Sequence, residues 1–156
     1  MIFLNNEDYL IVFELQRDSK QSLKELSKRT GISTSTIHSK IKKLESSGVI
    51  KKYTVILDSA LIGKPTTAFI LVTLRNTASS GNKIDFRQIA KKIAENPFVI
   101  EVFTISGEFD VLIKVKGADL KEIGNYILDS LRKMEGVDKT ITFDAMEIVK
   151  EDGMLM

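Results

Sequence analysis

The chain has 156 residues, of which 43% are hydrophobic and 28% charged, and its net charge is +2. This composition is typical of a folded globular protein. The absence of cysteine excludes disulfides, thiolate nucleophiles and cysteine-based zinc sites. No apolar run approaches the roughly 20 residues that cross a bilayer, and the start, MIFLNNEDYL, has no signal-peptide pattern, so we expect a cytoplasmic protein without a membrane span.

The first helix is predicted from Asn6, as its N-cap, to Arg17. Its apolar face consists of Ile11, Val12 and Leu15. The second helix begins after Ser22, which has the spacing of a capping box with Glu25, and it ends at Gly31, a usual residue for a left-handed helix exit. Three short helices are therefore expected before residue 50, and the third is the most informative.

This third helix opens at Ser33 and ends near Gly48. Its apolar residues recur at helical spacing: Ile37, Ile41 and Leu44. Only the four residues from Thr30 to Ser33 separate it from the second helix, so the two helices must cross steeply, as in a helix-turn-helix. Residues 48–58, GVIKKYTVILD, are predicted to form a following strand, a candidate wing with Lys51 and Lys52 in reach of a DNA backbone.

Positive charge is concentrated around these helices. Nine basic residues between Ser19 and Lys52 face only Glu25 and Glu45, whereas the chain after residue 65 is net negative. Such a segment suits an acidic polymer, although a lysine-rich, solvated helical surface has the same composition. A helix for the major groove needs an apolar back, small polar residues near its N-terminus and cations for phosphates. The third helix has all three, and its other faces carry Thr34, Ser35, His38, Ser39, Lys42 and Lys43.

Residues 59–66 contain Gly63 and Pro65, and we place a linker there between a DNA-binding domain over residues 1–58 and a second domain over residues 67–156. The elements expected in the second domain are strand Thr67–Arg75, helix Asp85–Glu95 with Phe86, Ile89 and Ile93 inward, strand Phe98–Ser106, strand Phe109–Lys116, helix Leu120–Lys133 after a capping box of Asp119 and Glu122, and strand Lys139–Val149. The order βαββαβ predicts a ferredoxin-like domain, so the fold class is α+β.

A sheet of this kind covers only one of its faces with its own helices. The other face must be polar or buried by something else. Leu112 is expected there, and the strand from Val99 to Ile105 is apolar on both sides apart from Glu101. The sheet of a second subunit is the simplest cover, so we expect at least a homodimer, which also supplies the two-fold symmetry that a helix-turn-helix reader normally needs.

The whole chain resembles the leucine-responsive regulatory protein and AsnC family, also called feast/famine regulators. The segments that carry the resemblance are ELQRDSKQSLKELSKRTGIS, STIHSKIKKLESSGVIKKYTVILD, SGEFDVLIKV and MEIVKE. The resemblance implies sequence-specific binding to double-stranded DNA, dimers that assemble further, for example into octamers, and control by an amino acid in the second domain. The sequence differs from well-known members of the family at one point: its third helix starts with STST, whereas theirs starts with SPTP.

Carried over by position, the resemblance makes Ser33 to Ser46 the recognition helix. The residues implied near bases are Ser33, Thr34, Ser35, Thr36, His38 and Ser39, and those near phosphates are Lys40, Lys42 and Lys43. His38 either contacts a base or phosphate or is a bystander at the surface. The different helix start leaves the operator sequence unpredicted.

The resemblance also implies an effector loop, with Thr104, Ile105, Ser106, Gly107, Glu108, Phe109 and Asp110 as its candidate residues. Backbone amides beside Gly107 could approach a carboxylate, and Asp110 could accept from an α-amino group. The competing interpretation is structural, with Gly107 making a hairpin turn and Asp110 forming a solvated pair with Lys114.

Catalysis is not expected, because the chain has one histidine, no P-loop and no G-x-G-x-x-G motif. Neither a metal site nor a cofactor is predicted, apart from the amino-acid effector. Two other functions stay open: a ligand-sensing oligomer that acts on a protein partner, and an architectural protein that binds DNA without sequence preference. Salt-sensitive preference for one promoter would separate a specific regulator from both.

Overall fold

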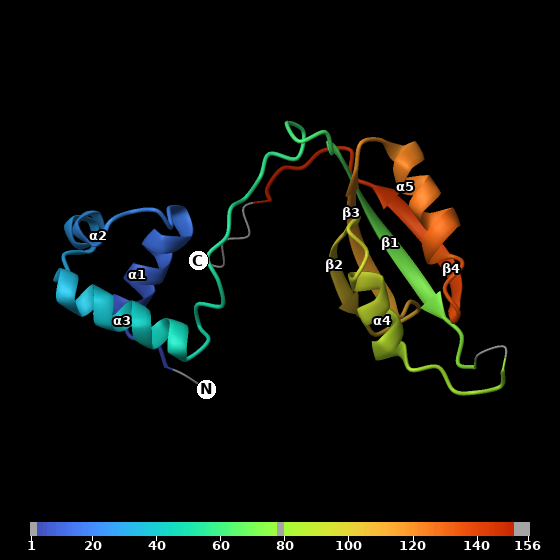
Figure 1. The fold of residues 1–156 in the computed structure, drawn as a ribbon, viewed down its shortest axis with the longest axis horizontal. Coiled ribbons are helices and arrows are strands. Elements are labelled where there is room, and N and C mark those ends of the chain that lie inside the picture. Colours follow the sequence, from blue (N-terminus) through green and yellow to red (C-terminus); the bar gives the residue numbers. More distant parts are fainter. Residues whose placement is uncertain (1–2, 78–79, 152–156) are drawn as a thin grey trace. The chain divides into compact units, whose positions relative to one another are not determined.

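The computed structural model describes residues 3–77 and 80–151. They divide into two compact units, the first made of residues up to 56 together with those from 150 onward, and the second of residues 57–149. The first unit contains helices α1 (Asn6–Arg17), α2 (Leu23–Thr30) and α3 (Thr34–Ser46). The second contains all the strands (Figure 1). No helix within the described ranges is both long and apolar enough to pass through a bilayer.

Helix α1 begins one residue earlier than predicted, because Asn5 rather than Asn6 is its N-cap. The Asn5 side chain accepts a hydrogen bond from the Asp8 amide at 2.9 Å, and the Asp8 carboxylate accepts one from the Asn5 amide at 3.0 Å. A reciprocal box needs an acceptor side chain three residues after the cap. Asp8 supplies it for Asn5, whereas Asn6 would have Tyr9 in that position.

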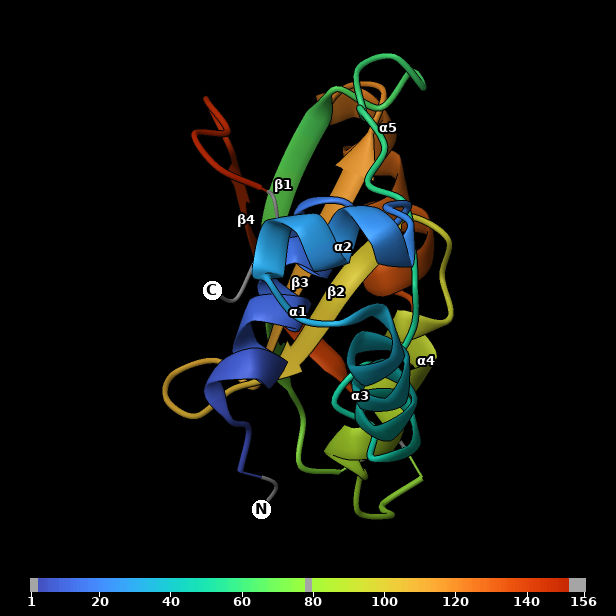
Figure 2. The same ribbon diagram turned by 90° about the vertical axis from the view of Figure 1, so that its left-hand side faces the viewer.

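The predicted second helix and turn are confirmed. Ser22 and Glu25 form a capping box, and Gly31 ends α2 with a φ of 73°. A β-carbon is disfavoured in that left-handed conformation, which is why the turn takes glycine. Figure 2 shows α2 lying across the view while α3 is seen nearly end-on, so the two helices cross steeply. This is the arrangement of a helix-turn-helix.

The predicted apolar faces of the three helices meet in one core. Its buried members are Ile11, Leu26, Ile32, Ile37 and Leu44, and Val12, Leu15 and Ile41 pack around them. Burial of each large aliphatic side chain contributes about 1.5–3 kcal/mol, so this small core holds α3 firmly on the other two helices.

The strand predicted over residues 48–58 is wrong, since residues 51–58 form no secondary structure. Val55, Ile56 and Leu57 are 68%, 72% and 59% exposed. A strand requires a neighbour to pair with its amides and carbonyls, and the described part of the chain offers none to this segment. Tyr53 is held by its hydroxyl, which donates to Glu45 Oε1 at 2.9 Å.

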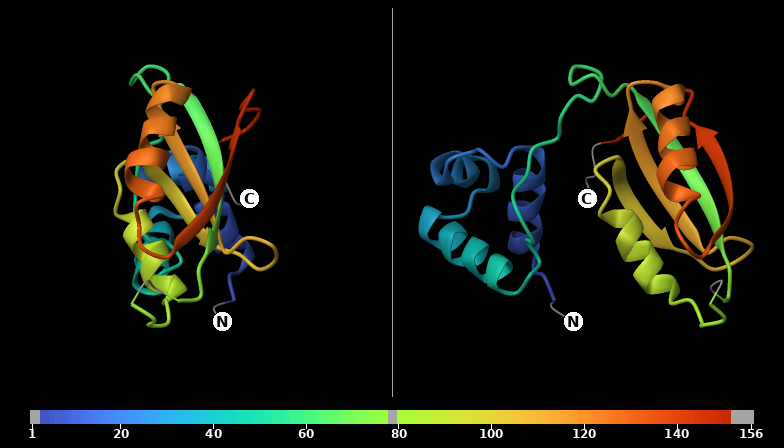
Figure 3. Two further views of the ribbon diagram at one scale, coloured as in Figure 1. Left: turned by 90° about the vertical axis from the view of Figure 1, so that its right-hand side faces the viewer. Right: turned by 45° about the vertical axis from the view of Figure 1, so that its right-hand side comes forward.

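The second unit has the predicted order βαββαβ. Its elements are β1 (Thr66–Leu74), α4 (Phe86–Ala94), β2 (Val99–Thr104), β3 (Val111–Gly117), α5 (Leu120–Tyr126) with the π-helical η1 (Ile127–Leu131), and β4 (Val137–Asp144). The sheet order is β2-β3-β1-β4, and every pairing is antiparallel. Figure 3 shows α4 and α5 on the same face of the sheet, which confirms the ferredoxin-like α+β prediction.

Strict alternation divides the central strands between the two faces of this sheet. Ala68, Ile70, Val72 and Leu74 of β1 are buried beneath the helices, as are Val111, Ile113 and Val115 of β3. The helices contribute Ile93, Ile123, Tyr126, Ile127 and Leu131 to the same core. The inward face predicted for α4 is confirmed, because Phe86 and Ile89 pack beside Ile93.

The opposite face of the sheet carries a row of apolar residues in register across all four strands. Phe103 of β2 pairs with Leu112 of β3, which pairs with Leu71 of β1, which pairs with Ile141 of β4. An aromatic pair, Phe69 of β1 and Phe143 of β4, lies beside this row. Phe103, Phe69 and Phe143 are 47%, 36% and 54% exposed. Neither α4 nor α5 covers this face (Figure 3).

Two predicted bounds in the second unit are wrong. Strand β4 ends at Asp144 rather than Val149, because the pairing of β4 with β1 ends where Asp144 lies opposite Ala68. The last helix changes at Ile127 to π-helical bonding, in which the Arg132 amide donates to the Ile127 carbonyl at 2.9 Å. Asp119 is the N-cap of this helix, as predicted, because its side chain accepts a hydrogen bond from the Glu122 amide at 2.7 Å. The reciprocal bond of the box differs, since the Glu122 carboxylate accepts from the Ala118 amide instead of the Asp119 amide.

Candidate nucleic-acid interface and effector loop

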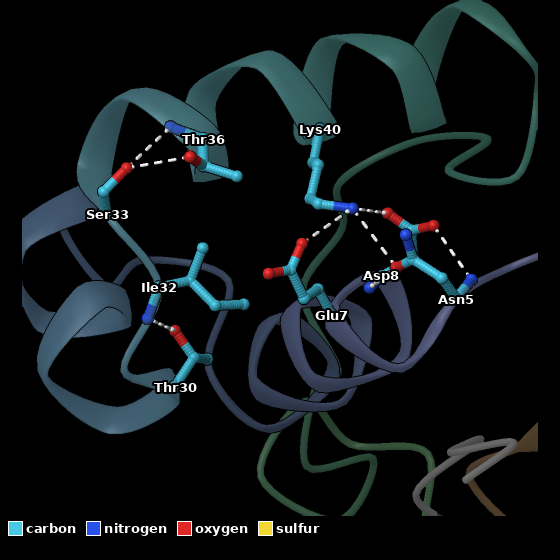
Figure 4. Close-up of polar contacts among 8 residues, drawn as sticks. All are labelled: Asn5, Glu7, Asp8, Thr30, Ile32, Ser33, Thr36 and Lys40. Carbon is cyan, nitrogen blue, oxygen red and sulfur yellow. Dashed lines mark hydrogen bonds and ion pairs between the residues drawn. The ribbon is translucent and has the colours of Figure 1, made fainter.

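The start of α3 is organised by the hydroxyl of Ser33. Its side chain accepts a hydrogen bond from the Thr36 amide at 3.2 Å and lies 2.8 Å from the Thr36 hydroxyl and 3.0 Å from the Ser35 hydroxyl (Figure 4). Ser33 therefore caps the helix and shares its hydroxyl with its neighbours. This capping contact orders the first turn of α3. No acidic side chain is present in that turn.

From Thr34 to Lys43, the exposed side of α3 carries polar and basic residues only. The one acid of the helix, Glu45, is exposed near its end, where it accepts a hydrogen bond from the Tyr53 hydroxyl. Thr34, Ser35, His38, Ser39 and Lys42 are exposed and lie at helical spacing, and Lys43 is exposed beside them. The buried face consists of Ile37 and Leu44. The positive end of the helix dipole at Ser33 adds to the charge of the two lysines. This surface, Thr34 to Lys43 on the exposed side of α3, is hereafter the α3 face.

Lys40 points away from the α3 face and toward α1 (Figure 4). Its Nζ lies 2.9 Å from Asp8 Oδ1, 3.2 Å from Glu7 Oε2 and 3.2 Å from Asn5 Oδ1. The hydrogen bond that Lys40 donates to the Asp8 carboxylate raises the pKa of Lys40 above its ordinary value. These three oxygens accept the hydrogen bonds of the Lys40 ammonium, so Lys40 joins α3 to α1. Its ammonium points into the domain, and we therefore leave Lys40 out of the proposed phosphate contacts.

Sequence reasoning missed this cluster, although a signal was present. The spacing of Asn5 and Asp8 is that of a capping box, which places an aspartate in the first turn of α1. The contact with Lys40 spans 32 positions in the chain, and only the packing of α3 on α1 brings the two residues together.

The predicted effector loop follows β2 and leads into β3. Thr104, Ile105, Ser106, Gly107 and Glu108 are exposed, whereas Phe109 and Asp110 are half-buried. Gly107 has a φ of 132°, a conformation that favours glycine. The Ile105 amide donates to the Asp110 carbonyl at 2.9 Å and so closes the loop.

Asp110 has a structural contact that the sequence did not indicate. Its Oδ2 accepts a hydrogen bond from the Leu74 amide at 2.7 Å, and its own amide donates to the Val72 carbonyl at 2.9 Å. Lys114 pairs with Glu101 at 3.6 Å, so the pair predicted between Asp110 and Lys114 is wrong. One carboxylate oxygen of Asp110 thus anchors the loop to the end of β1.

Replacement of Asp110 by alanine will loosen the end of β1 in the absence of any ligand. The Leu74 amide, on a residue only 6% exposed, loses its acceptor, and this costs about 1–2 kcal/mol. Hydrogen exchange by NMR at the Leu74 amide measures the effect, which should be a loss of protection of roughly five- to thirtyfold. Asp110→Asn keeps an acceptor oxygen and should lose less. An unchanged Leu74 amide in Asp110→Ala would contradict the anchoring role.

No group of three or more His, Cys, Asp or Glu side chains within the described ranges is arranged to hold a metal ion. The α3 face presents hydroxyls and cations, which suit a polyanion. The loop of the second unit presents a glycine and a carboxylate, which suit a small polar ligand. A helix-turn-helix joined to a ferredoxin-like domain with these two features defines a DNA-binding regulator that carries a ligand-binding domain.

The comparisons with known proteins agree with this class. Residues 67–155 match the family model of the Lrp/AsnC ligand binding domain, and residues 4–51 match that of a winged helix-turn-helix DNA-binding domain. An uncharacterised HTH-type transcriptional regulator of Pyrococcus abyssi is 36% identical over 149 residues, which cover 96% of this chain and 97% of the relative. The HTH-type transcriptional regulator FL11 of Pyrococcus horikoshii is 36% identical over 95% of this chain and 93% of its own.

Solved structures show the same relationship. An AsnC family transcriptional regulator from Agrobacterium tumefaciens is 27% identical, with a TM-score of 0.87 over 98% of this chain and 97% of its own. A transcriptional regulator of Neisseria meningitidis in complex with L-Met is 26% identical, with a TM-score of 0.86 over 96% of this chain and 94% of its own. The chain belongs to the Lrp/AsnC family, and it is a DNA-binding transcriptional regulator rather than an enzyme.

Proposed function

We propose that this regulator recognises specific promoter sequences as a homodimer through the α3 face, and that an amino acid bound at the loop of residues 104–110 modulates its assembly or its binding to DNA. The observation that carries the DNA-binding part is the α3 face itself. It is exposed and free of acids, and its hydroxyls precede its lysines along the helix. Hydroxyls near the N-terminus suit base edges, and cations further along suit phosphates.

Within the α3 face, the proposed base contacts are Thr34, Ser35, His38 and Ser39, and the proposed phosphate contacts are Lys42 and Lys43. Ser33 and Thr36 act on the same surface by ordering the first turn, because their hydroxyls bond to each other at 2.8 Å. A purely architectural protein needs only cations, so the hydroxyl-rich first turn favours sequence recognition over unspecific coating of DNA.

The uncovered sheet face supports the proposed dimer. Apolar side chains run across all four strands there, and soluble monomers rarely expose such continuous patches. A second copy of the sheet buries this surface and is related by a two-fold axis that suits two half-sites on DNA. Dimers that assemble further, up to octamers, are part of the same proposal.

The effector proposal rests on the loop and on one neighbour. Gly107 and the remaining oxygen of Asp110 offer backbone amides and a carboxylate, which complement the two charged ends of a free amino acid. The related Neisseria regulator was solved in complex with L-Met. L-methionine is therefore the first ligand to test on this chain, within a pool of other amino acids.

The deciding experiment measures binding of the purified chain to the DNA upstream of its own gene and to an unrelated fragment of equal length, at two salt concentrations, with and without L-methionine or mixed amino acids. We expect tight, fragment-selective binding that weakens steeply with salt and shifts with an amino acid. Sedimentation of the same samples reports the oligomeric state. Equal binding to both fragments would favour an architectural role, and binding to neither would overturn the proposal for that DNA.

Replacement of Lys42 by alanine will weaken binding to all DNA sequences by a similar factor, roughly tenfold, and lower the slope of log affinity against log salt by about 1. The reason is the loss of one phosphate contact from the α3 face. Lys91→Ala removes an exposed lysine from α4, on the helical side of the second unit and not on the sheet face proposed for the dimer, and serves as the control. An unchanged salt slope in Lys42→Ala would remove Lys42 from the interface.

A further inference from the structure

The chain folds back onto the last turn of α3 as soon as the helix ends. Gly48 has a φ of 75°, and its amide donates a hydrogen bond to the Glu45 carbonyl at 3.0 Å. The Ile50 amide donates to the Leu44 carbonyl at 3.0 Å, and Val49 and Ile50 pack against the helical core. These bonds are typical of a left-handed helix exit. Ile50 is therefore fixed beside the end of α3 by both its backbone and its side chain.

Three residues later, the chain is attached to α3 a second time. The Tyr53 hydroxyl donates a hydrogen bond to Glu45 Oε1 at 2.9 Å, although residues 51–58 form no secondary structure. Partial burial of this hydroxyl and its bond to Glu45 raise the pKa of Tyr53 above its ordinary value, so the hydroxyl keeps its proton and remains the donor. Three residues of extended chain span at most about 11 Å. The segment between Ile50 and Tyr53 is therefore confined to the neighbourhood of the last turn of α3.

The second attachment lies on the side of α3 that carries the α3 face. Glu45 stands three residues after Lys42 and seven after His38, and residues at these spacings share one side of a helix. Glu45, Lys42 and His38 are all exposed. The Tyr53 hydroxyl therefore reaches the edge of the α3 face rather than the helical core.

Two exposed lysines, Lys51 and Lys52, lie between the two attachments. Within residues 3–77 and 80–151, neither lysine forms an ion pair. Glu45 is the single acid between Lys42 and Tyr53 in the sequence. The attached segment thus places two further cations near the end of the helix whose lysines are the proposed phosphate contacts.

We propose that Tyr53 is a positioning residue for DNA binding. Its bond to Glu45 holds residues 51–52 beside the α3 face, so that both lysines contact phosphates of the DNA backbone next to those of Lys42 and Lys43. A segment that is already attached loses less conformational freedom on binding than a loose one, so the bond raises affinity without touching DNA. This inference rests on the DNA binding proposed above and adds a second phosphate-binding segment to it.

The test is a double-mutant cycle between the Tyr53 hydroxyl and the two lysines. Fluorescence anisotropy of a labelled duplex from the DNA upstream of the gene gives the affinity of the full chain at several salt concentrations. The combined variant Lys51→Ala, Lys52→Ala should lower the slope of log affinity against log salt by about 1–2. Tyr53→Phe should weaken binding roughly three- to tenfold when the lysines are present, and less than about twofold when they are absent.

Two variants of Glu45 isolate the hydrogen bond from the charge. Glu45→Gln and Glu45→Ala both remove the negative charge that opposes phosphates, but only glutamine keeps an acceptor for the Tyr53 hydroxyl. We expect Glu45→Gln to bind the duplex more tightly than Glu45→Ala, and Tyr53→Phe to weaken binding only in the Glu45→Gln background. Tyr9→Phe is the control and should keep wild-type affinity, because Tyr9 lies in α1 and is 47% exposed, close to the 50% of Tyr53.

Circular dichroism verifies that each variant is folded. Wild-type affinity in Tyr53→Phe, an equal loss with and without the two lysines, or equal affinities of Glu45→Gln and Glu45→Ala would overturn the positioning role while leaving the proposed DNA binding intact. Absence of binding by the wild-type chain would instead refute the proposed function, and this inference with it.

Discussion

Replacement of Gly136 by alanine will destabilise the second unit by about 3 kcal/mol. Gly136 lies between η1 and β4 with a φ of 97°, and its carbonyl accepts a hydrogen bond from the Arg75 amide at 2.8 Å. A β-carbon there would overlap the side chain of Ile89 and press on that of Ile84. The substitution therefore combines backbone strain with overpacking against α4.

Hydrogen exchange of the buried β1 and β3 amides measures this loss, because these strands open only when the whole unit unfolds. Gly63→Ala is the matched control. Gly63 has a similar positive φ of 75°, but no atom lies within 4 Å of its added β-carbon, so only backbone strain of about 1 kcal/mol is expected. Equal losses in the two variants would show that the contact with Ile89 and Ile84 has no energetic importance.

Replacement of Lys40 by methionine will destabilise the helical unit by about 2–3 kcal/mol. The substitution keeps most of the aliphatic chain and removes the ammonium. Asp8, which is 8% exposed, is then left as a nearly buried carboxylate without its cation. Denaturant unfolding followed by hydrogen exchange of the α1 and α3 amides reports the loss. Lys42→Met, on the exposed side of the same helix, should leave stability within about 0.5 kcal/mol of the wild type.

The same contact makes the stability of the helical unit depend on acid. The hydrogen bond from Lys40 holds the pKa of Asp8 below its ordinary value of 3.8. A depressed carboxyl pKa contributes stability that is fully present above pH 3.8 and is lost as pH falls through the lower, folded-state pKa. Stability of α1 and α3 should therefore decline below pH 3.8 in the wild type and decline less in Lys40→Met. Parallel acid profiles for the two proteins would contradict this assignment.

Prediction from the sequence succeeded where contacts are local or strictly periodic. Ser22 and Glu25 form the capping box that their spacing indicates. Val111, Ile113 and Val115 are buried beneath the helices, as their alternation predicts. A side chain at a regular spacing has only one face of its element to occupy, so periodicity predicts burial well.

Prediction failed where an element needs a partner distant in the chain. The β-branched and aromatic residues of segment 48–58 are typical of a strand, but no strand forms there because nothing in the described chain pairs with it. Strand β4 likewise ends at Asp144, at the limit of its pairing with β1, although apolar residues continue to Val149. Propensity sets where a strand is able to form, and a neighbouring strand sets where it does form.

The sequence by itself determined the three helices, the βαββαβ order and the hydroxyl-rich, acid-free face of α3, because each follows from spacing within about ten residues. Only the tertiary structure decided which polar groups meet. It turned Lys40 from a candidate phosphate contact into the ion pair that joins α3 to α1, and it bound Asp110 to the backbone of Leu74. These contacts depend on how the elements pack, and packing across 32 or 36 positions leaves no local pattern in the chain.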